Sequence, residues 1–185
     1  RRMEALAATL GSDVPFFLTG GTARCTGRGD RVEVLRDMRP LRMLILVPPV
    51  PAGEAKTARR YAALTPHDFG HGHISQRLAH RIARNAPPPT NDLVNVFERV
   101  IERTQPELVA HYAVYSAAGA PRLHLCGAGP AVFLLVTEGA KIAELRRDFG
   151  VTGATVIEAH TLPRAAALNI ERIAATAQPG ANAPQ

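Results

Sequence analysis

The fold of this chain is decided near its start, by Leu10-Gly-Ser-Asp-Val-Pro-Phe-Phe-Leu18 and then Gly20-Gly-Thr-Ala-Arg-Cys-Thr-Gly-Arg-Gly29. The first run places one carboxylate, Asp13, on a short turn between a glycine and a proline. In the second run, β-like segments at 22–26 and 31–35 flank Gly27-Arg28-Gly29-Asp30, which is typical of a hairpin turn. The stretch therefore predicts a turn that carries a carboxylate, followed by a compact basic hairpin.

Asp13 has two interpretations. An aspartate directly before Val-Pro is typical of a helix N-cap, with Pro15 in the first turn, where its missing N–H costs nothing. A carboxylate on a tight turn beside a glycine can also accept a proton from a substrate hydroxyl, because glycine allows backbone and substrate to approach closely. The two interpretations are compatible, since a helix end holds a side chain rigidly.

Outward from this stretch, the hydrophobic pattern alternates strands with helical segments. Apolar positions at Met3, Leu6 and Leu10 predict a helix over residues 1–10. We expect strands at residues 41–47, 123–126, 130–136 and 154–161, the third of them buried on both faces. We expect helices at residues 53–64, 74–85, 91–103, 107–118 and 140–149. The sum is an α+β fold, with a connector and plausible domain boundary at residues 37–40.

The composition is that of a globular chain with a core, since 46% of its 185 residues are apolar. No apolar run is long enough to span a bilayer, and the first residues lack a signal-peptide pattern. Cys25 and Cys126 lie far apart without a CxxC spacing, so we expect free thiols in a reducing cytosol. We therefore expect a cytoplasmic protein without a membrane partner. The first residue is not Met, which favours a fragment or a processed product.

The net charge of +6 is almost entirely arginine, and Lys56 and Lys141 are the only lysines. A basic balance fits phosphate-bearing partners, either nucleotides or nucleic acid. The arginines are spread along the chain, however, and no basic stripe is interleaved with aromatic residues. The pattern therefore does not favour a nucleic-acid partner.

Two further motifs could carry chemistry. Gly127-Ala128-Gly129 lies between two expected strands, so its backbone N–H groups could face an anion, although such a run is more often a plain turn. Thr57 and Tyr61 are one helical turn apart and so share a face. A tyrosine on such a face can stack on a base, while a half-buried position in the core is the commoner alternative.

Two other runs have plain interpretations. Thr90-Asn91-Asp92-Leu93 follows three prolines and predicts a helix start capped by Thr90 or Asn91. His67-Asp-Phe-Gly-His71-Gly-His73 fits no standard zinc pattern and has no cysteine nearby. We therefore expect a polar loop there, and no metal site.

Taken together and in this order, the segments resemble the 4-diphosphocytidyl-2-C-methyl-D-erythritol kinases, which belong to the GHMP kinases. The resemblance runs to about residue 170. The matching segments are 10–18, 20–29, a strand ending at Pro48, Thr57 with Tyr61, Asn91-Asp92-Leu93, and Cys126-Gly-Ala-Gly-Pro-Ala-Val-Phe133.

The resemblance implies a fold and an activity. Residues 1–38 would be the tail of the GHMP N-terminal domain, which is ribosomal-protein-S5-like, and residues 39–170 the ferredoxin-like C-terminal domain. Residues 171–185 would be a disordered tail. The implied activity is ATP-dependent phosphorylation of the 2-hydroxyl of 4-diphosphocytidyl-2-C-methyl-D-erythritol, in the non-mevalonate route to isoprenoids, with ATP and Mg²⁺ as cofactors.

The resemblance also implies roles for individual residues. Asp13 matches the family's catalytic aspartate, which takes or orients the hydroxyl proton. Tyr61 matches an aromatic that stacks on the cytosine, and Thr57 lies on the same substrate-binding face. Gly127, Ala128 and Gly129 match the third GHMP motif, which supports the phosphate-binding loop. Position 12 is often Ala in the family and is Ser here.

The chain departs from the family by lacking its N-terminal lysine and any Gly-x-Gly-Gly-x-Ser-Ser run, which wraps the ATP phosphates. We therefore expect the C-terminal portion of such a kinase, inactive alone, with residues 1–36 less protected than residues 41–162. One alternative is another GHMP enzyme, such as a homoserine or mevalonate kinase. Another is a non-catalytic α+β binding module, in which Asp13 is only a cap and the glycine loop only a turn. Nothing in the sequence predicts an oligomeric state.

Overall fold

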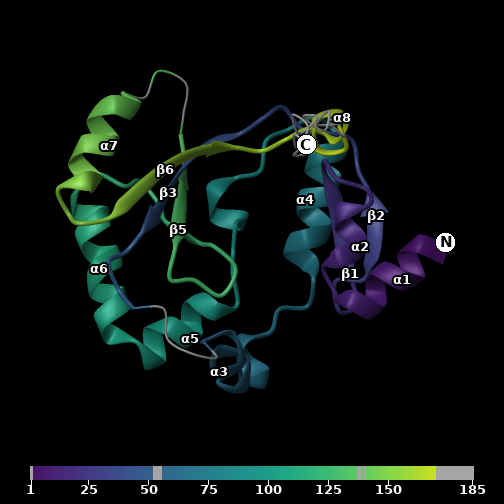
Figure 1. Ribbon diagram of the computed structural model, residues 1–185, viewed down its shortest axis with the longest axis horizontal. Helices are drawn as coiled ribbons and strands as arrows, with labels where there is room; N and C mark the ends of the chain where they lie inside the picture. The colour runs from purple at the N-terminus through teal and green to yellow at the C-terminus, as the bar shows by residue number, and fades with distance from the viewer. Residues whose placement is uncertain (1, 52–55, 137–138, 140, 170–185) are drawn as a thin grey trace, which may run out of the picture.

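A computed structural model describes residues 2–51, 56–136, 139 and 141–169 of the chain. Its helices and strands are mixed, as the sequence predicted (Figure 1). The helices are α1 (Arg2–Leu10), α2 (Val14–Phe17), α3 (Lys56–Ala62), α4 (His73–Ala83), α5 (Phe97–Thr104), α6 (Pro106–Ala117), α7 (Ile142–Gly150) and α8 (Arg164–Ala167), with short 3-10 helices η1 (Pro66–Asp68) and η2 (Thr90–Asp92). The strands are β1 (Ala23–Thr26), β2 (Arg31–Val34), β3 (Arg42–Val47), β4 (His124–Leu125), β5 (Val132–Leu135) and β6 (Thr155–His160).

The first part of the chain forms the predicted hairpin. β1 and β2 pair antiparallel, with Cys25 opposite Val32, and α1 and α2 pack beside them. Asp37, in the connector that follows, accepts hydrogen bonds from the backbone N–H of Arg164 at 2.8 Å and of Thr22 at 3.1 Å. These two bonds hold the pKa of Asp37 below its ordinary value. The connector thus ties the hairpin to the segment after β6, where α8 was not expected from the sequence.

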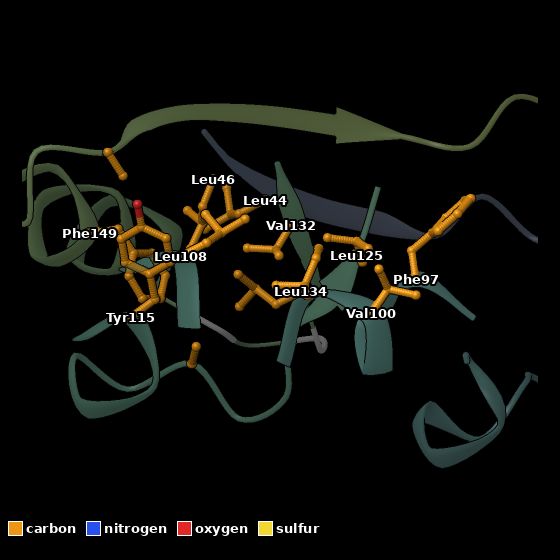
Figure 2. Close-up of a cluster of buried hydrophobic side chains, with 13 residues drawn as sticks. Leu44, Leu46, Phe97, Val100, Leu108, Tyr115, Leu125, Val132, Leu134 and Phe149 are labelled. Atoms are coloured by element: carbon orange, nitrogen blue, oxygen red, sulfur yellow. The ribbon is translucent and has the colours of Figure 1, made fainter. Parts of the chain in front are cut away.

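The second part is a four-stranded sheet in the order β4-β5-β3-β6, and every neighbouring pair is antiparallel. Leu44 and Leu46 of β3 are fully buried on the face that α5, α6 and α7 cover. Figure 2 shows Leu108 and Tyr115 of α6 and Phe149 of α7 converging on these strand residues. The apolar alternation of β3 and β5 therefore places one core on one side of the sheet.

β5 corrects one expectation of the sequence. Val132 and Leu134 are buried in the core, as predicted. Phe133 and Leu135, which point to the other face, are only half-buried. The ring of His124 lies 5.2 Å from that of Phe133, so part of this second face is covered by a neighbouring strand. The prediction of burial on both faces is therefore only partly right.

The helix expected over residues 91–103 begins later than predicted. Residues 90–92 form only the short helix η2, and α5 starts at Phe97. Between them, the Leu93 carbonyl is hydrogen-bonded to His124, and the Asn95 side-chain amide donates to Leu125 O in β4 and to Gly127 O after it. In a continuous helix the Leu93 carbonyl would accept a hydrogen bond from within the helix. Here these tertiary hydrogen bonds hold residues 93–95 outside a helix, so α5 begins later. The expected disorder after residue 170 lies outside the described residues.

Uneven protection is expected between the two parts of the chain. Four apolar side chains of α1 and α2 are more than 60% exposed, namely Met3, Leu6, Leu10 and Phe17. A two-stranded hairpin with little buried apolar area opens easily. We therefore predict that amides of residues 2–36 exchange faster than those of β3 and β5. Hydrogen exchange read by mass spectrometry tests this, and equal slow exchange in both parts would contradict it.

No helix in the described ranges combines the length and apolar character that crossing a bilayer requires.

Candidate active site

Helix α3 carries the two residues that the sequence singled out as a substrate face. Thr57 is exposed, and Tyr61 one turn later is 61% exposed. The Tyr61 ring meets the buried ring of Phe97 edge-on, with centroids 5.0 Å apart at 89°. This contact holds the ring in place, and its exposure leaves most of its surface open. Tyr61 is thus anchored on the core and still available for stacking.

The glycine loop after β4 is a tight turn with two left-handed residues. Gly127 has φ +52° and Gly129 has φ +69°, a region that side chains other than glycine rarely adopt. The turn closes through hydrogen bonds from Gly129 N to Cys126 O at 2.7 Å and from Cys126 N to Ala131 O at 2.9 Å. The glycines at these positions are therefore required by the backbone itself.

Asn95 fastens the glycine loop from the segment before α5. Its Nδ2 donates to Gly127 O at 2.8 Å and to Leu125 O at 3.2 Å. Its Oδ1 accepts a hydrogen bond from Phe97 N at 3.0 Å, which holds the amide at the start of α5. Tyr112 donates to Pro130 O at 2.8 Å on the far side of the loop, and burial raises the pKa of this phenol. The loop is thus held from both sides.

Helix α3 contacts the glycine loop through two basic residues that the sequence reasoning missed. Lys56 donates from Nζ to Gly129 O. Arg60 is only 3% exposed, and its Nη2 donates to Gln105 Oε1 at 2.7 Å. Its Nε and Nη1 are buried and have no hydrogen-bond partner among the described residues. Burial lowers the pKa of this guanidinium. No local pattern in the sequence distinguishes Arg60 from its neighbour Arg59, which is exposed.

Asp13 precedes α2, in the N-cap position, with Pro15 in the first turn. Its exposed side chain makes no capping hydrogen bond, so the cap interpretation holds for the position and not for the carboxylate. The carboxylate lies beside the hairpin: an added Cβ on Gly29 would be 3.2 Å from Asp13 Oδ1. Burial, and then the charge of Asp13, raise the pKa of Cys25 in the same hairpin.

The structure therefore brings some of the predicted site residues together and not others. Thr57 and Tyr61 share α3 with the lysine and arginine that contact the glycine loop. Asp13 belongs to the hairpin part, and α2, which it precedes, packs on α1 and β2. In Figure 1, α2 and α3 stand apart in the view. The glycine loop and the Tyr61 face form one unit, and the carboxylate lies on a second.

The histidine-containing segment 67–73 serves a structural purpose at Asp68. The Asp68 carboxylate accepts two hydrogen bonds from Arg103, at 2.8 and 2.9 Å, and two more from Thr65. Arg103, and then the backbone of Thr65, hold the pKa of Asp68 well below its usual range. Within the described ranges, no group of three or more histidine, cysteine or acidic side chains is placed to hold a metal ion.

His124 is expected to make the folding stability of the chain depend on pH. It is 3% exposed, and its Nδ1 lies 2.9 Å from Leu93 O, so this nitrogen carries the proton of a neutral ring. Burial lowers its pKa, although Leu93 O and Glu98 act in the other direction. In the unfolded chain, His124 is protonated as the pH falls through about 6.5, whereas in the folded chain it stays neutral to a lower pH. The free energy of unfolding therefore falls as the pH drops below about 6.5.

We predict that His124→Asn, which keeps a donor and does not titrate, flattens this loss. The measurement is the urea midpoint at several values between about pH 7.5 and 5. His80→Asn, on the exposed face of α4, is the matched control and should retain the wild-type profile. The same slope in wild type and His124→Asn would refute the assignment.

Known proteins resemble this chain over most of its length. No family model matches the sequence. A 4-diphosphocytidyl-2-C-methyl-D-erythritol kinase of Dehalococcoides mccartyi is 38% identical over 137 residues, which is 74% of this chain and 48% of the relative. The same kinase of Symbiobacterium thermophilum is 36% identical over 134 residues, 72% of this chain and 47% of the relative. The chain spans about half the length of the curated relatives it matches.

A solved structure gives the same result. The crystal structure of a 4-(cytidine 5'-diphospho)-2C-methyl-D-erythritol kinase superposes with a TM-score of 0.61 and 29% identity, over 86% of this chain and 57% of that chain. The mixed fold of helices and sheet thus resembles that of GHMP kinases. Within that class, the chain is homologous to the 4-diphosphocytidyl-2-C-methyl-D-erythritol kinases.

Proposed function

We propose that this chain supplies the substrate side of an ATP-dependent kinase that phosphorylates the 2-hydroxyl of 4-diphosphocytidyl-2-C-methyl-D-erythritol. The observation that carries the proposal is the junction of α3 with the glycine loop. The exposed Tyr61 and Thr57 lie on the same short helix as Lys56, whose Nζ bonds Gly129 O. An exposed tyrosine that could stack on a base, joined to a glycine loop through Lys56, would suit a nucleoside diphosphate.

The proposed roles follow from what each group can do. Tyr61 offers an exposed aromatic ring for the cytosine, while the T-shaped contact with Phe97 holds the ring in place. Thr57 would hydrogen-bond the same part of the substrate. Asp13 would accept or orient the proton of the attacking hydroxyl, since its carboxylate is exposed and makes no capping bond. Gly127, Ala128 and Gly129 would support the loop that binds the phosphates.

ATP would supply the transferred phosphoryl group, with Mg²⁺ neutralising the phosphate charge. Magnesium usually keeps several waters and binds through one or two carboxylates together with the phosphates, so it would arrive with the nucleotide. We also propose a ferredoxin-like domain for residues 39–170. Its support is the element order from β3 on: strand, helices, two strands, helix, strand.

Residues 1–185 alone should not turn over ATP. Their sequence contains no Gly-x-Gly-Gly-x-Ser-Ser run, and catalysis of phosphoryl transfer is largely positioning and charge stabilisation around the phosphates. We expect ATP hydrolysis and phosphorylation by this chain at the level of an Asp13→Asn control. Turnover clearly above that control would show that residues 1–185 suffice for catalysis.

Titration with CDP tests the substrate side directly. The chain has no tryptophan and three tyrosines, and Tyr61 is the exposed one among Tyr61, Tyr112 and Tyr115. We predict saturable quenching of tyrosine fluorescence by CDP, with weaker quenching by inorganic phosphate. Tyr61→Ala should weaken binding by about tenfold or more, since stacking on a base contributes about 1–3 kcal/mol.

Phe69→Ala is the matched control, because Phe69 is also an aromatic residue, 58% exposed, and belongs neither to α3 nor to the glycine loop. Its CDP affinity should equal that of the wild type. Absence of saturable CDP binding, or equal loss in the two variants, would count against a cytidine site on α3.

A further inference from the structure

A cavity of about 730 Å³ lies where the connector between the two sheets meets the end of α4 and the end of β5. Its lining includes Arg39, Ile82, Asn85, Arg122 and Leu135. None of its lining residues belongs to the Asp13 turn, to α3 or to the glycine loop. In Figure 1 the connector between β2 and β3 crosses the top of the view, opposite α3. The cavity is therefore separate from the candidate active site, and its volume is typical of a small-molecule site.

The charge of the lining has one sign. Three arginines line the cavity, and no aspartate or glutamate does. Arg42 is compensated by Glu158, with 2.7 Å between Nη2 and Oε1. Arg122 meets only a neutral partner, since its Nη1 donates to Asn91 Oδ1 at 3.1 Å. Arg39 makes no ion pair or hydrogen bond within the described part of the chain. Two positive charges thus remain uncompensated beside the cavity.

The rest of the lining is largely apolar. Ile82 of α4, Leu41 of the connector and Leu135 of β5 are each half-buried. Leu135 lies on the face of the sheet that the helical core does not cover. Because that face is less covered, its β5 side chains are only half-buried. An aliphatic body placed there would remove this remaining apolar surface from water. The cavity therefore pairs an apolar wall with an arginine pair.

We propose that this cavity binds a free aliphatic phosphate ester, with its head on Arg39 and Arg122 and its chain against Ile82, Leu41 and Leu135. Two guanidinium groups without acidic partners match a dianionic phosphate better than a carboxylate of single charge. The remaining donors of Arg122 and the whole fork of Arg39 are available for charge-assisted hydrogen bonds. The site is additional to the CDP face on α3 and does not depend on it.

Calorimetric titration of residues 1–185 with octyl phosphate, below its micelle concentration, tests the proposal. We expect one molecule bound per chain, with at least tenfold weaker binding of inorganic phosphate and of octanoate. Arg39→Ala should weaken octyl phosphate binding about tenfold, the usual effect of losing a charge-assisted hydrogen bond. Arg36→Ala, an exposed arginine outside the cavity lining, removes the same charge and should leave binding unchanged.

Hydrogen exchange with and without octyl phosphate locates the ligand, and we expect added protection at residues 38–42 and 82–87. Absence of saturable binding, equal losses in Arg39→Ala and Arg36→Ala, or octanoate binding as tight as octyl phosphate would overturn the proposal. Binding to vesicles of anionic phospholipid without binding of the monomer would overturn it too, because it would identify a membrane surface. Retention of CDP binding by Arg39→Ala separates this test from that of the kinase site.

Discussion

Replacing Gly129 with alanine is expected to lower the free energy of unfolding by about 2–4 kcal/mol, the sum of two costs. Gly129 has φ +69°, where a side chain costs about 1 kcal/mol or more. An added Cβ would also lie 2.7 Å from Leu125 Cδ1 and 2.9 Å from Arg60 Nη1. Both neighbours are buried, at 5% and 3% exposure, so neither has free space to move into. Overpacking of this kind costs about 1–3 kcal/mol.

Gly127→Ala is the control that separates the two costs. Gly127 has φ +52°, but an added Cβ would meet nothing within 4 Å. Its substitution should therefore cost only about 1 kcal/mol, the backbone part. Urea unfolding of the two variants gives the comparison, and CDP titration shows whether the loop still supports the α3 face. Equal destabilisation by the two changes would mean that Arg60 and Leu125 do not pack tightly against the loop.

This contrast shows what the sequence could predict of the site and what it could not. The glycine loop and the shared face of Thr57 and Tyr61 were found from local patterns, because turn chemistry and helical spacing are local properties. Arg60 was missed because a basic residue on a short helix is usually solvated. Its burial depends on Gln105 and Gly129, which are distant in sequence. Lys56 was missed for the same reason.

The arrangement of the helices and strands was likewise predictable from the sequence only in part. The strands around Leu44 and Val132 were predictable, because alternating apolar residues bury one face of a sheet wherever it forms. The late start of α5 was not, because Asn95 and Leu93 bond partners about 30 residues later in the chain. The bond between Asp37 and Arg164, 127 residues apart, has no local signal at all. The Arg39 cavity was also invisible, since its lining comes from several separate segments.

Phe149→Ala is expected to be the most destabilising single change, at about 3–5 kcal/mol. Phe149 is fully buried at the end of α7 and packs with Leu44, Leu46 and Tyr115 in the core of the four-stranded sheet (Figure 2). Truncation would remove its apolar area from the core and leave a cavity that close-packed neighbours cannot fill. A loss of this size is a large part of the total stability of a domain. Thermal and urea unfolding measure it.

Phe17→Ala removes the same atoms from α2, where the side chain is 70% exposed and its ring centroid lies 5.6 Å from that of Phe16. It should cost no more than about 1 kcal/mol. The two variants also separate stability from function. Well below its unfolding midpoint, Phe149→Ala should bind CDP as tightly as the wild type, because α7 packs on β6 while the Tyr61 ring contacts Phe97 of α5, whereas Gly129→Ala should bind it more weakly. Weaker CDP binding by fully folded Phe149→Ala would mean that the α3 face and the α7 side of the core are coupled.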